Sequence, residues 1–492
     1  MEIDKNIFFH IYREFFFVFI VFFIFPGVNS MSEEYYFDSK KGSDHNDGLS
    51  PESPWKSFAN LKNIDISSIS RIFLASGATF NDNLVFEANF SGRKGNEIII
   101  SSYGEGQAEL DADDGTAIKL YKSSNLIIKN IKLKGKGRKA GNNGCGIELV
   151  QTDNILIDNV EVSGFRIAGI RTSGDRNTTI KKVYAHDNGG AGIEICGWDE
   201  NFSENIHITS CITENNPGDP EKKDNHSGNG IIVGNAKKVL VEYCVASNNG
   251  WDMPRQGNGP VGIWGWNCDS LIIQYCISHD NKSPGFDGGG FDLDGGCTNS
   301  IIQYNLSYNN YGAGYLLCQY PGASEWKNNI LRNNISFNDG LKNTNSGIHV
   351  WVGDKNFSKA QIYKNIIINP KYAVSAVYDI PNFDYFDYSE NIFISGKELI
   401  YGLMKGARFE GNLYWQTGIG DFCLFDGQRF SSLEEWARIT GQEMKNGKLV
   451  GVVRDPRITI PENTEELKVI IPEDLKKMKL FRFDGEKKSV FE

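Results

Sequence analysis

The sequence predicts an all-β fold, a parallel β-helix of about ten or more coils, on three observations. Short segments such as KNIKLKG, YCVASNN and YNLSYNN recur along the chain, at steps of about 24 to 33 residues that are typical of a solenoid. A β-branched run such as NILID or KVLVE precedes each segment, and no helical periodicity lies between them. The loops vary in length while the strands do not, which favours about three short strands per coil.

The recurring segments align on one column of residues. We expect the asparagines of this column to form an inward ladder, in which each amide bonds its neighbours about 4.8 Å above and below. Cysteines in the same column are predicted to be small buried residues rather than disulfides. The column contains Asn130, Asn159, Val183, Cys211, Cys244, Cys276, Asn305, Asn334, Asn365, Asn391 and Asn412.

The nine cysteines include no CxxC pair, so a zinc or thioredoxin-type site has no support. An odd number of cysteines in an exported protein implies at least one free or intermolecular thiol.

The first 30 residues are predicted to be a signal peptide. Lys5 and Arg13 precede an apolar run at residues 15–25, and small residues follow up to a cut near Ser30. The run is too short to span a bilayer, although an uncleaved anchor helix is the alternative. We therefore expect a secreted, periplasmic or cell-surface protein without stable membrane insertion of the mature chain. The net charge of -11 and the absence of a Lys/Arg block exclude a nucleic-acid partner.

The β-helix is predicted to occupy residues 31–425 as a single domain. Both ends need caps, because an open coil exposes strand edges and core. Residues 35–37 lead into an N-terminal cap, and residues 426–492 form a C-terminal capping segment packed on the helix. Within the latter, residues 432–435 (SLEE) form a capping box that opens a short helix ended by Gly441.

The solenoid, the Asn column and the segment GSDHNDGLSPESPWKSF (residues 42–58) resemble the right-handed parallel β-helix proteins of the pectate-lyase-like superfamily, over about residues 35 to 440. This resemblance implies a right-handed coil and an enzyme acting on polysaccharides. The segment DGGGFDLDGG (residues 287–296) is similar to segments of β-helix glycosidases and lyases. The polygalacturonase and pectate-lyase catalytic motifs are absent, so neither mechanism is transferred to this chain.

A strand that begins with Gly and an apolar residue follows each Asn turn. Counting from that Gly, positions +1 and +3 point inward and positions +2 and +4 point outward. The outward residues on successive coils include Asp292 and Asp294, whose Cα atoms lie about 6.6 Å apart on one strand. The other outward candidates are Glu194, Trp264, Trp266, His349 and Trp351.

Long loops before these strands are expected to wall a groove over this face, since function usually lies on loops held by a rigid scaffold. They would supply Asp287, His226 and Arg255, together with Asp224, Asp252 and Lys282. Arg171, one coil below Glu194, is expected to be a solvated face residue.

Paired carboxylates beside tryptophans suit sugar chemistry, because a hydrolase needs one protonated carboxyl group and one carboxylate. We predict a glycoside hydrolase acting on a carbohydrate polymer or oligosaccharide, in which Asp292 and Asp294 are catalytic and Asp287 assists. No metal or cofactor is expected for a hydrolase. The predicted substrate-binding residues are Trp264, Trp266, His349, Trp351, Glu194, His226 and Arg255.

Three alternatives remain open. A calcium-dependent lyase acting on uronates would use the three aspartates as Ca²⁺ ligands and Arg255 or Lys282 as the base. A non-catalytic glycan-binding surface protein would keep the tryptophans without needing paired carboxylates. An Asp-x-Asp pair beside Gly-Gly can also be solvated turn chemistry.

Overall fold

A computed structural model of the chain describes residues 33–87, 90–198, 201–343, 346–369, 375–378, 386–402 and 406–458. The predicted signal peptide and the last part of the capping segment lie outside these ranges. Within them, no helix is long and apolar enough to cross a membrane.

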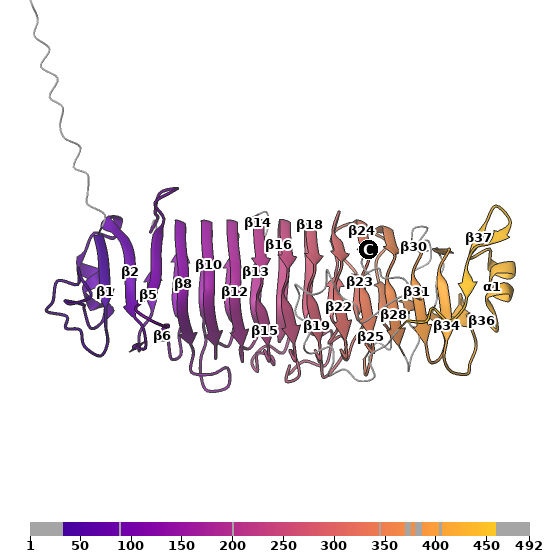
Figure 1. Ribbon diagram of the computed structural model, residues 1–492, viewed down its shortest axis with the longest axis horizontal. Coiled ribbons are helices and arrows are strands. Elements are labelled where there is room, and N and C mark those ends of the chain that lie inside the picture. Colours follow the sequence, from indigo (N-terminus) through magenta and orange to yellow (C-terminus); the bar gives the residue numbers. More distant parts are fainter. Residues whose placement is uncertain are drawn as a thin grey trace, which may run out of the picture.

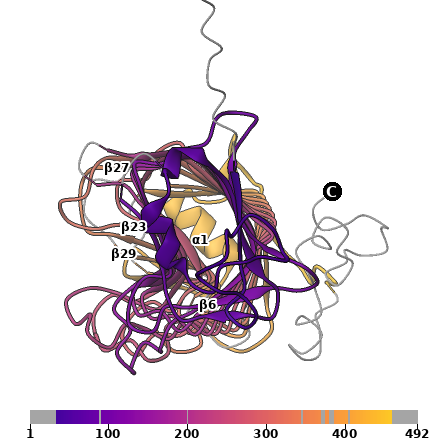
Figure 2. The same ribbon diagram turned by 90° about the vertical axis from the view of Figure 1, so that its left-hand side faces the viewer.

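The strands stack along one long axis, with an N-terminal cap at one end and helix α1 (Leu433–Thr440) at the other (Figure 1). Viewed down the axis, successive coils lie over one another (Figure 2). One continuous array of 34 strands is hydrogen-bonded from coil to coil, and adjacent strands in it run parallel, as between β10 (Asp153–Ser163) and β12 (Arg176–His186). The predicted parallel β-helix is confirmed.

Each full coil contributes strands to three sheets. The first, called the site sheet here, carries the outward residues of the predicted groove. In this sheet Glu194 is in register with Ile232 of the next coil, and Trp264 is in register with Asp292. Its strands are β4 (Leu84–Phe86), β7 (Ile118–Tyr121), β9 (Cys145–Val150), β11 (Ala168–Ser173), β13 (Ala191–Cys196), the first parts of β16 (Asn229–Glu242) and β18 (Ile263–Gln274), β20 (Phe291–Leu293), β23 (Tyr315–Gln319), β26 (Ile348–Val352) and β29 (Ser375–Tyr378).

The second sheet follows the site sheet along the chain in each coil, and it begins with the cap strand β1. Its members are β1 (Glu33–Phe37), β2 (Ile69–Ala75), β5 (Ile98–Tyr103), the first parts of β8 (Ser124–Lys134), β10 and β12, then β14 (Ser203–Thr209), the last parts of β16 and β18, β21 (Ile301–Gln303), β24 (Trp326–Arg332), β27 (Phe357–Tyr363), β30 (Phe386–Ser389) and β33 (Ala407–Glu410).

The third sheet closes each coil. Its members are β3 (Thr79–Phe80), β6 (Ala108–Asp111), the last parts of β8, β10 and β12, β15 (Ile212–Glu214), β17 (Val245–Ser247), β19 (Ile277–His279), β22 (Leu306–Tyr308), β25 (Ile335–Phe337), β28 (Ile366–Asn369), β31 (Ile392–Ser395), β34 (Leu413–Gln416) and β39 (Val452–Val453).

The predicted ladder exists from Asn305 to Asn412. Asn305 Nδ2 donates to Asn334 Oδ1 at 3.1 Å, Asn334 Nδ2 donates to Asn365 Oδ1 at 3.0 Å, and the pattern continues through Asn391 to Asn412. Their side chains are buried, so the ladder satisfies polar groups inside the coil. The three cysteines of the same column are also buried, and all nine cysteines of the chain are free thiols.

The alignment of Asn130 and Asn159 with this column is wrong by one residue. Val160 pairs with Ile131 and with Val183, so Ile131 and Val160 occupy the buried position. Asn130 and Asn159 lie at the preceding bend with φ near +53° and +55°, a left-handed conformation that Asn tolerates well. They bond each other at the exposed surface, Asn159 Nδ2 to Asn130 Oδ1 at 3.1 Å.

A second ladder, which the sequence interpretation did not include, precedes the strands of the site sheet. Asn249 Nδ2 donates to Asn281 Oδ1 at 3.0 Å, and Asn281 Nδ2 donates to Asn310 Oδ1 at 3.0 Å. The ladder ends on the carboxylate of Asp339, which accepts from Asn310 Nδ2 at 2.8 Å and from Ser336 Oγ at 2.7 Å. It anchors the roots of the loops that cover the site sheet.

Asp339→Asn is expected to stabilise the protein above mildly acidic pH. Burial raises the pKa of Asp339 to about 7, against the effect of the Ser336 and Asn310 hydrogen bonds, whereas an unfolded Asp titrates near 3.9. The folded state therefore holds a proton that the unfolded state has lost, so wild-type stability falls as pH rises from about 4 to about 7. Denaturant unfolding should show the variant's advantage growing by about 1.4 kcal/mol per pH unit in that window. A difference in unfolding free energy between variant and wild type that stays constant from pH 4 to pH 7 would contradict this prediction.

The two caps close the core with aromatic side chains. At the N-terminal end Trp55 stacks on Tyr35, with ring centroids 5.0 Å apart, before the 3₁₀ helices η1 (Phe58–Asn63) and η2 (Ile66–Ser68). The Asp44 carboxylate there accepts from the backbone N–H groups of Lys56 and Ser57. These bonds fold the loop back on itself, as an ordinary turn requires.

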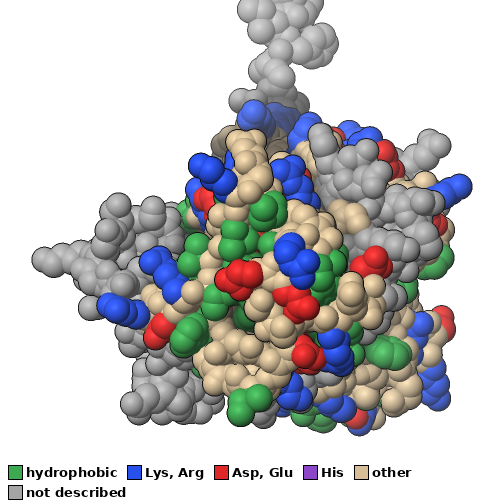
Figure 3. Space-filling view, turned by 90° about the vertical axis from the view of Figure 1, so that its right-hand side faces the viewer, with side chains coloured by type: hydrophobic (Ala, Val, Ile, Leu, Met, Phe, Trp, Pro, Cys, Tyr) green, Lys and Arg blue, Asp and Glu red, His purple; other side chains and the backbone are tan. Residues whose placement is uncertain are grey.

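At the C-terminal end the predicted helix is confirmed as α1. Ser432 is its N-cap and Gly441, in the left-handed conformation, ends it. Trp436 of this helix is fully buried against Phe409 and Phe425. Acidic, basic and apolar side chains are mixed over the described surface at this end (Figure 3).

The first Asn ladder ends in the same region. Buried Glu443 accepts from Asn412 Nδ2 at 2.7 Å and from the Tyr414 hydroxyl at 2.8 Å, so the last amide is not left without an acceptor. Short strand pairs complete the cap, namely β32 (Ile400–Gly402) with β35 (Cys423–Phe425) and β36 (Gln428–Phe430), and β37 (Met444–Lys445) with β38 (Lys448–Leu449).

Candidate functional site

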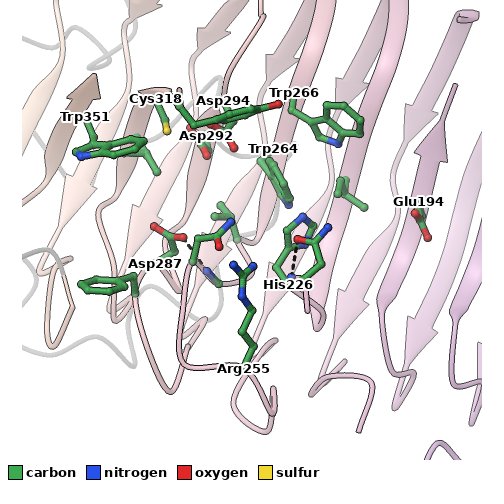
Figure 4. Close-up of a pocket in the computed structure, with 18 of the residues that line it drawn as sticks. Glu194, His226, Arg255, Trp264, Trp266, Asp287, Asp292, Asp294, Cys318 and Trp351 are labelled. Atoms are coloured by element: carbon green, nitrogen blue, oxygen red, sulfur yellow. Dashed lines mark hydrogen bonds between the residues drawn. The ribbon is translucent and has the colours of Figure 1, made fainter. Parts of the chain in front are cut away.

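A cavity of about 1010 Å³ lies over the outer face of the site sheet. All ten residues that the sequence analysis predicted to be catalytic or substrate-binding line it, and Figure 4 shows how those that it labels lie on neighbouring strands and loops. They are Glu194, His226, Arg255, Trp264, Trp266, Asp287, Asp292, Asp294, His349 and Trp351.

Strand alternation aims these side chains. Phe291 and Leu293 of β20 are fully buried in the core, so Asp292 between them points to the opposite face. The Gly that begins such a strand is required by close packing. A Cβ on Gly290 would lie 2.3 Å from Ser307 Oγ of β22, the third-sheet strand of the same coil.

Asp292 is the most deeply placed of the three aspartates. Its side chain is 2% exposed, and its Oδ1 has no hydrogen-bond partner in the described part of the chain. Burial, followed by the charges of Asp294 and Asp287, raises the pKa of Asp292 well above its usual range. These surroundings therefore favour the protonated, neutral form of the Asp292 carboxyl group.

Asp287 lies at the end of the loop that precedes β20 and is partly exposed. Its backbone has φ +59°, in the left-handed region that Asp, like Asn, tolerates. Its Oδ2 accepts from Gly259 N at 2.8 Å. Burial raises the pKa of Asp287 to about 6, although the Gly259 N–H and the Arg255 charge oppose the rise.

Asp294 is also partly exposed, and it is the carboxylate best supplied with donors. Its Oδ1 accepts from Gly295 N at 2.7 Å, and the Cys318 thiol lies beside it (Figure 4). Burial raises the pKa of Asp294, but the Cys318 and Gly295 hydrogen bonds stabilise the charged form and oppose that rise. The three carboxyl groups thus share one cavity in three different environments.

The three tryptophans differ in what they offer a ligand. Trp264 is only 3% exposed, and its Nε1 donates to Asn229 Oδ1 at 2.9 Å. Trp266 and Trp351 are partly exposed. Trp266 covers Gly234 of the coil below, where a Cβ would lie 2.3 Å from its Nε1. Ring surface is therefore available mainly from Trp266 and Trp351.

The two predicted histidines are neutral donors or acceptors rather than cations. Burial lowers the pKa of His349 to about 4. Burial, with the charges of Lys222 and Arg255, lowers the pKa of His226 to about 3.

Some expected placements are corrected. Arg171, expected on a solvated face, lines the cavity with its Nε 3.6 Å from Glu194 Oε2. Asp252 does not reach the cavity, because it forms ion pairs with Arg138 and Lys139 of another loop. Lys282 instead donates to Asn248 Oδ1 at 2.9 Å.

Among the cavity residues that sequence reasoning missed are Tyr320 and Asn343. Tyr320 could have been found by extending the outward alternation of β23 one pair beyond Cys318. Asn343 belongs to a loop of a later coil and donates to the Asp287 carbonyl at 2.8 Å, for which no local pattern gives a signal.

In the ranges that the structure describes, no group of three or more His, Cys, Asp or Glu side chains is arranged to hold a metal ion.

Comparisons with known proteins are consistent with this architecture. The family model described as "Right handed beta helix region" matches residues 56–223 and 222–382, more than half of the chain. The lacto-N-biosidase of Bifidobacterium longum is 33% identical over 91 residues, which cover 18% of this chain and 5% of that protein.

Two solved structures share the fold. The GH136 lacto-N-biosidase from Eubacterium ramulus matches with 20% identity, a TM-score of 0.56 and coverage of 73% of this chain and 67% of that one. The complex of XylC with xylose matches with 8% identity, a TM-score of 0.51 and coverage of 87% and 88%. At these identities the likeness concerns the fold. The predicted resemblance to right-handed parallel β-helix proteins is confirmed, and the chain belongs to the right-handed β-helix family.

Proposed function

We propose that this protein is an exported glycoside hydrolase that cleaves an oligosaccharide or polysaccharide bound in the cavity over the site sheet. The observation that carries the proposal is the group of three aspartates with unequal environments on one wall of that cavity. Carboxyl groups whose pKa values are pushed apart can divide the acid and base roles. The similar proteins named lacto-N-biosidase, one of them a GH136 enzyme, support hydrolysis as the reaction.

The environments suggest distinct roles. Asp294 is supplied with donors that favour its charged form, so it is the carboxylate that activates water or attacks the anomeric carbon. Asp287 is more exposed than Asp292 and its pKa is raised to about 6, so we assign it as the acid that protonates the leaving oxygen. Burial favours the neutral form of Asp292, whose ionisation would be opposed by the charges of Asp294 and Asp287. This assigns Asp287 a larger role than the sequence alone suggested.

Sugar rings would lie against Trp266 and Trp351, with hydroxyl groups bonded by His349, Glu194, His226 and Arg255. The cavity runs from Glu194, three coils below Asp292, to Trp351, two coils above it. At about 4.8 Å per coil this is roughly 24 Å.

The pH profile tests the acid. Because Asp287 must be protonated to act, kcat/KM is expected to fall about tenfold per pH unit above pH 6. Arg255→Gln removes a positive charge that lowers the pKa of Asp287, so the falling limb should move to higher pH. Initial rates between pH 4 and pH 8 measure the pH profiles of wild type and of Arg255→Gln. If kcat/KM falls over the same pH range in both, the assignment of Asp287 as the acid is contradicted.

A panel of neutral, uronate-containing and lacto-N-biose-containing glycans tests the reaction class. Reducing ends should appear without absorbance near 235 nm, with or without chelator, if the enzyme is a hydrolase. Absorbance that disappears with chelator and returns with calcium would instead indicate the lyase. Binding without any cleavage across the panel would favour the glycan-binding protein.

A further inference from the structure

Asn229, at the start of β16, links two residues of the cavity wall. It is 3% exposed. Its Oδ1 accepts from Trp264 Nε1 at 2.9 Å and from Val261 N at 3.4 Å. Its Nδ2 lies 3.2 Å from the Gly190 carbonyl and 3.2 Å from His226 Nδ1.

The orientation of this amide is determined by its partners. The indole N–H of Trp264 and the backbone N–H of Val261 can only donate, so the atom that faces them must be the Asn229 oxygen. The Gly190 carbonyl can only accept, so the atom that faces it must be the Asn229 nitrogen. A flipped amide would lose these bonds, because its NH₂ group would face the two N–H donors and its oxygen would face the Gly190 carbonyl oxygen.

This orientation determines the tautomer of His226. Since Asn229 Nδ2 is a donor, His226 Nδ1 must accept and cannot carry a proton. A neutral imidazole then has its proton on Nε2. Within the described ranges Nε2 has no hydrogen-bond partner, and His226 lines the cavity.

Packing and charge maintain the neutral ring. His226 meets Trp264 edge-on, with ring centroids 4.9 Å apart and an interplanar angle of 72°. The charged groups that act on it are the cations Lys222 and Arg255, and with burial they oppose protonation. A proton on Nδ1 would also face the Asn229 amide hydrogens.

We propose that Asn229 is a positioning residue that holds His226 neutral, with its proton on Nε2, as a fixed donor to an oxygen of the bound sugar. The receiving atom is an acceptor, such as a hydroxyl or carbonyl oxygen. The contact to sugar rests on the proposed function, whereas the state of His226 does not.

Long-range ¹⁵N–¹H correlation spectra of protein labelled with [¹⁵N]His test the state of His226 directly, because they separate protonated from unprotonated ring nitrogens. Signals lost in His226→Gln identify the residue. We expect an unprotonated Nδ1, a protonated Nε2 and no titration between pH 5 and pH 8. A protonated Nδ1, or titration near pH 6.5, would overturn the proposal whatever the enzyme's activity.

Asn229→Asp is the informative variant, since the carboxylate still accepts from Trp264 and now accepts from His226 Nδ1–H. The proton should move to Nδ1 in the neutral ring, and the ring should become chargeable. Asn225→Asp is the matched control, because it adds the same charge beside His226, keeps the acceptor for the His226 backbone N–H and leaves Asn229 in place. Its Nε2–H tautomer should persist.

Affinity for the fastest-cleaved glycan of the panel tests the contact. Dissociation constants are measured by tryptophan fluorescence in an inactive Asp294→Asn background. With Asn229→Asp added, the dissociation constant should match the background at pH 5, where imidazolium still donates from Nε2. It should be about tenfold higher at pH 8, where that donor is lost. If the ratio of the two dissociation constants does not depend on pH, His226 is not a donor to the sugar, and the proposal of hydrolysis is unaffected.

If Asn229→Asp fails to fold, Trp264→Phe serves instead. It removes the indole donor that orients Asn229, and a mixture of His226 tautomers is then expected.

Discussion

Asp294→Asn is expected to lower kcat/KM by at least about 10³-fold, the scale of losing an acid–base or nucleophilic group. Asn keeps the shape of the side chain and can still accept from Gly295 N, but it cannot activate water or attack carbon. Affinity for glycan should persist, because the tryptophans and the donors of the opposite wall are unchanged. Thermal stability should not fall, since burial already disfavours the charge of Asp294.

The measurement compares initial rates, melting temperature and dissociation constant for Asp294→Asn, Asp287→Asn and Asp292→Asn. Asp269→Asn is the matched control, because Asp269 lies on the second-sheet part of β18, away from the cavity lining, with Asn299 and Thr298 as partners. Its turnover should equal that of wild type. Full turnover in a folded Asp294→Asn variant would remove Asp294 from the reaction and return the base role to Asp292.

Asn334→Ala is expected to be strongly destabilising, at roughly 3–5 kcal/mol. The substitution removes four hydrogen bonds. The backbone N–H and the Nδ2 of Asn305 both lose their acceptor, Asn334 Oδ1, at 3.0 Å and 3.1 Å. The Ile302 carbonyl and Asn365 Oδ1 each lose a donor at 3.0 Å. All of these groups lie where water cannot replace the bonds.

Guanidinium unfolding followed by circular dichroism and hydrogen exchange measures this loss. Asn333→Gly is the matched control, since the neighbouring asparagine sits at a bend with φ +55° that glycine also adopts. Its unfolding midpoint should change little. Equal midpoints for the two variants would show that the ladder contributes specificity of register rather than stability.

Much of the fold was predictable from the sequence, because its signals are local. Inward and outward residues alternate along each short strand, so the shared face of Glu194, Trp264 and Asp292 follows from counting. The ladder from Asn305 to Asn412 was equally visible, as one residue type recurring at the coil period. The one-residue error at Asn130 and Asn159 arose because a bend asparagine and a ladder asparagine look alike in sequence.

The cavity itself was predictable only in part. Counting placed ten residues on or above one face, but it treated Asp292 and Trp264 as exposed, and both are almost wholly covered. The contributions of Arg171 and Asn343 were not predicted. The reason is that loop conformation is set by contacts between distant coils, such as Asn343 with the Asp287 carbonyl.

The sequence by itself determined the coil repeat, the direction of each strand side chain and the set of candidate residues. The repeat is visible as recurring segments, and side chains alternate between the two faces of a strand at every residue. Only the tertiary structure decided how deeply each carboxyl group is buried, and therefore how strongly burial opposes its charge. It also decided the state of His226, since that depends on an amide held between Trp264 and Gly190. Desolvation and hydrogen-bond orientation come from groups far apart in the chain, and no local pattern encodes them.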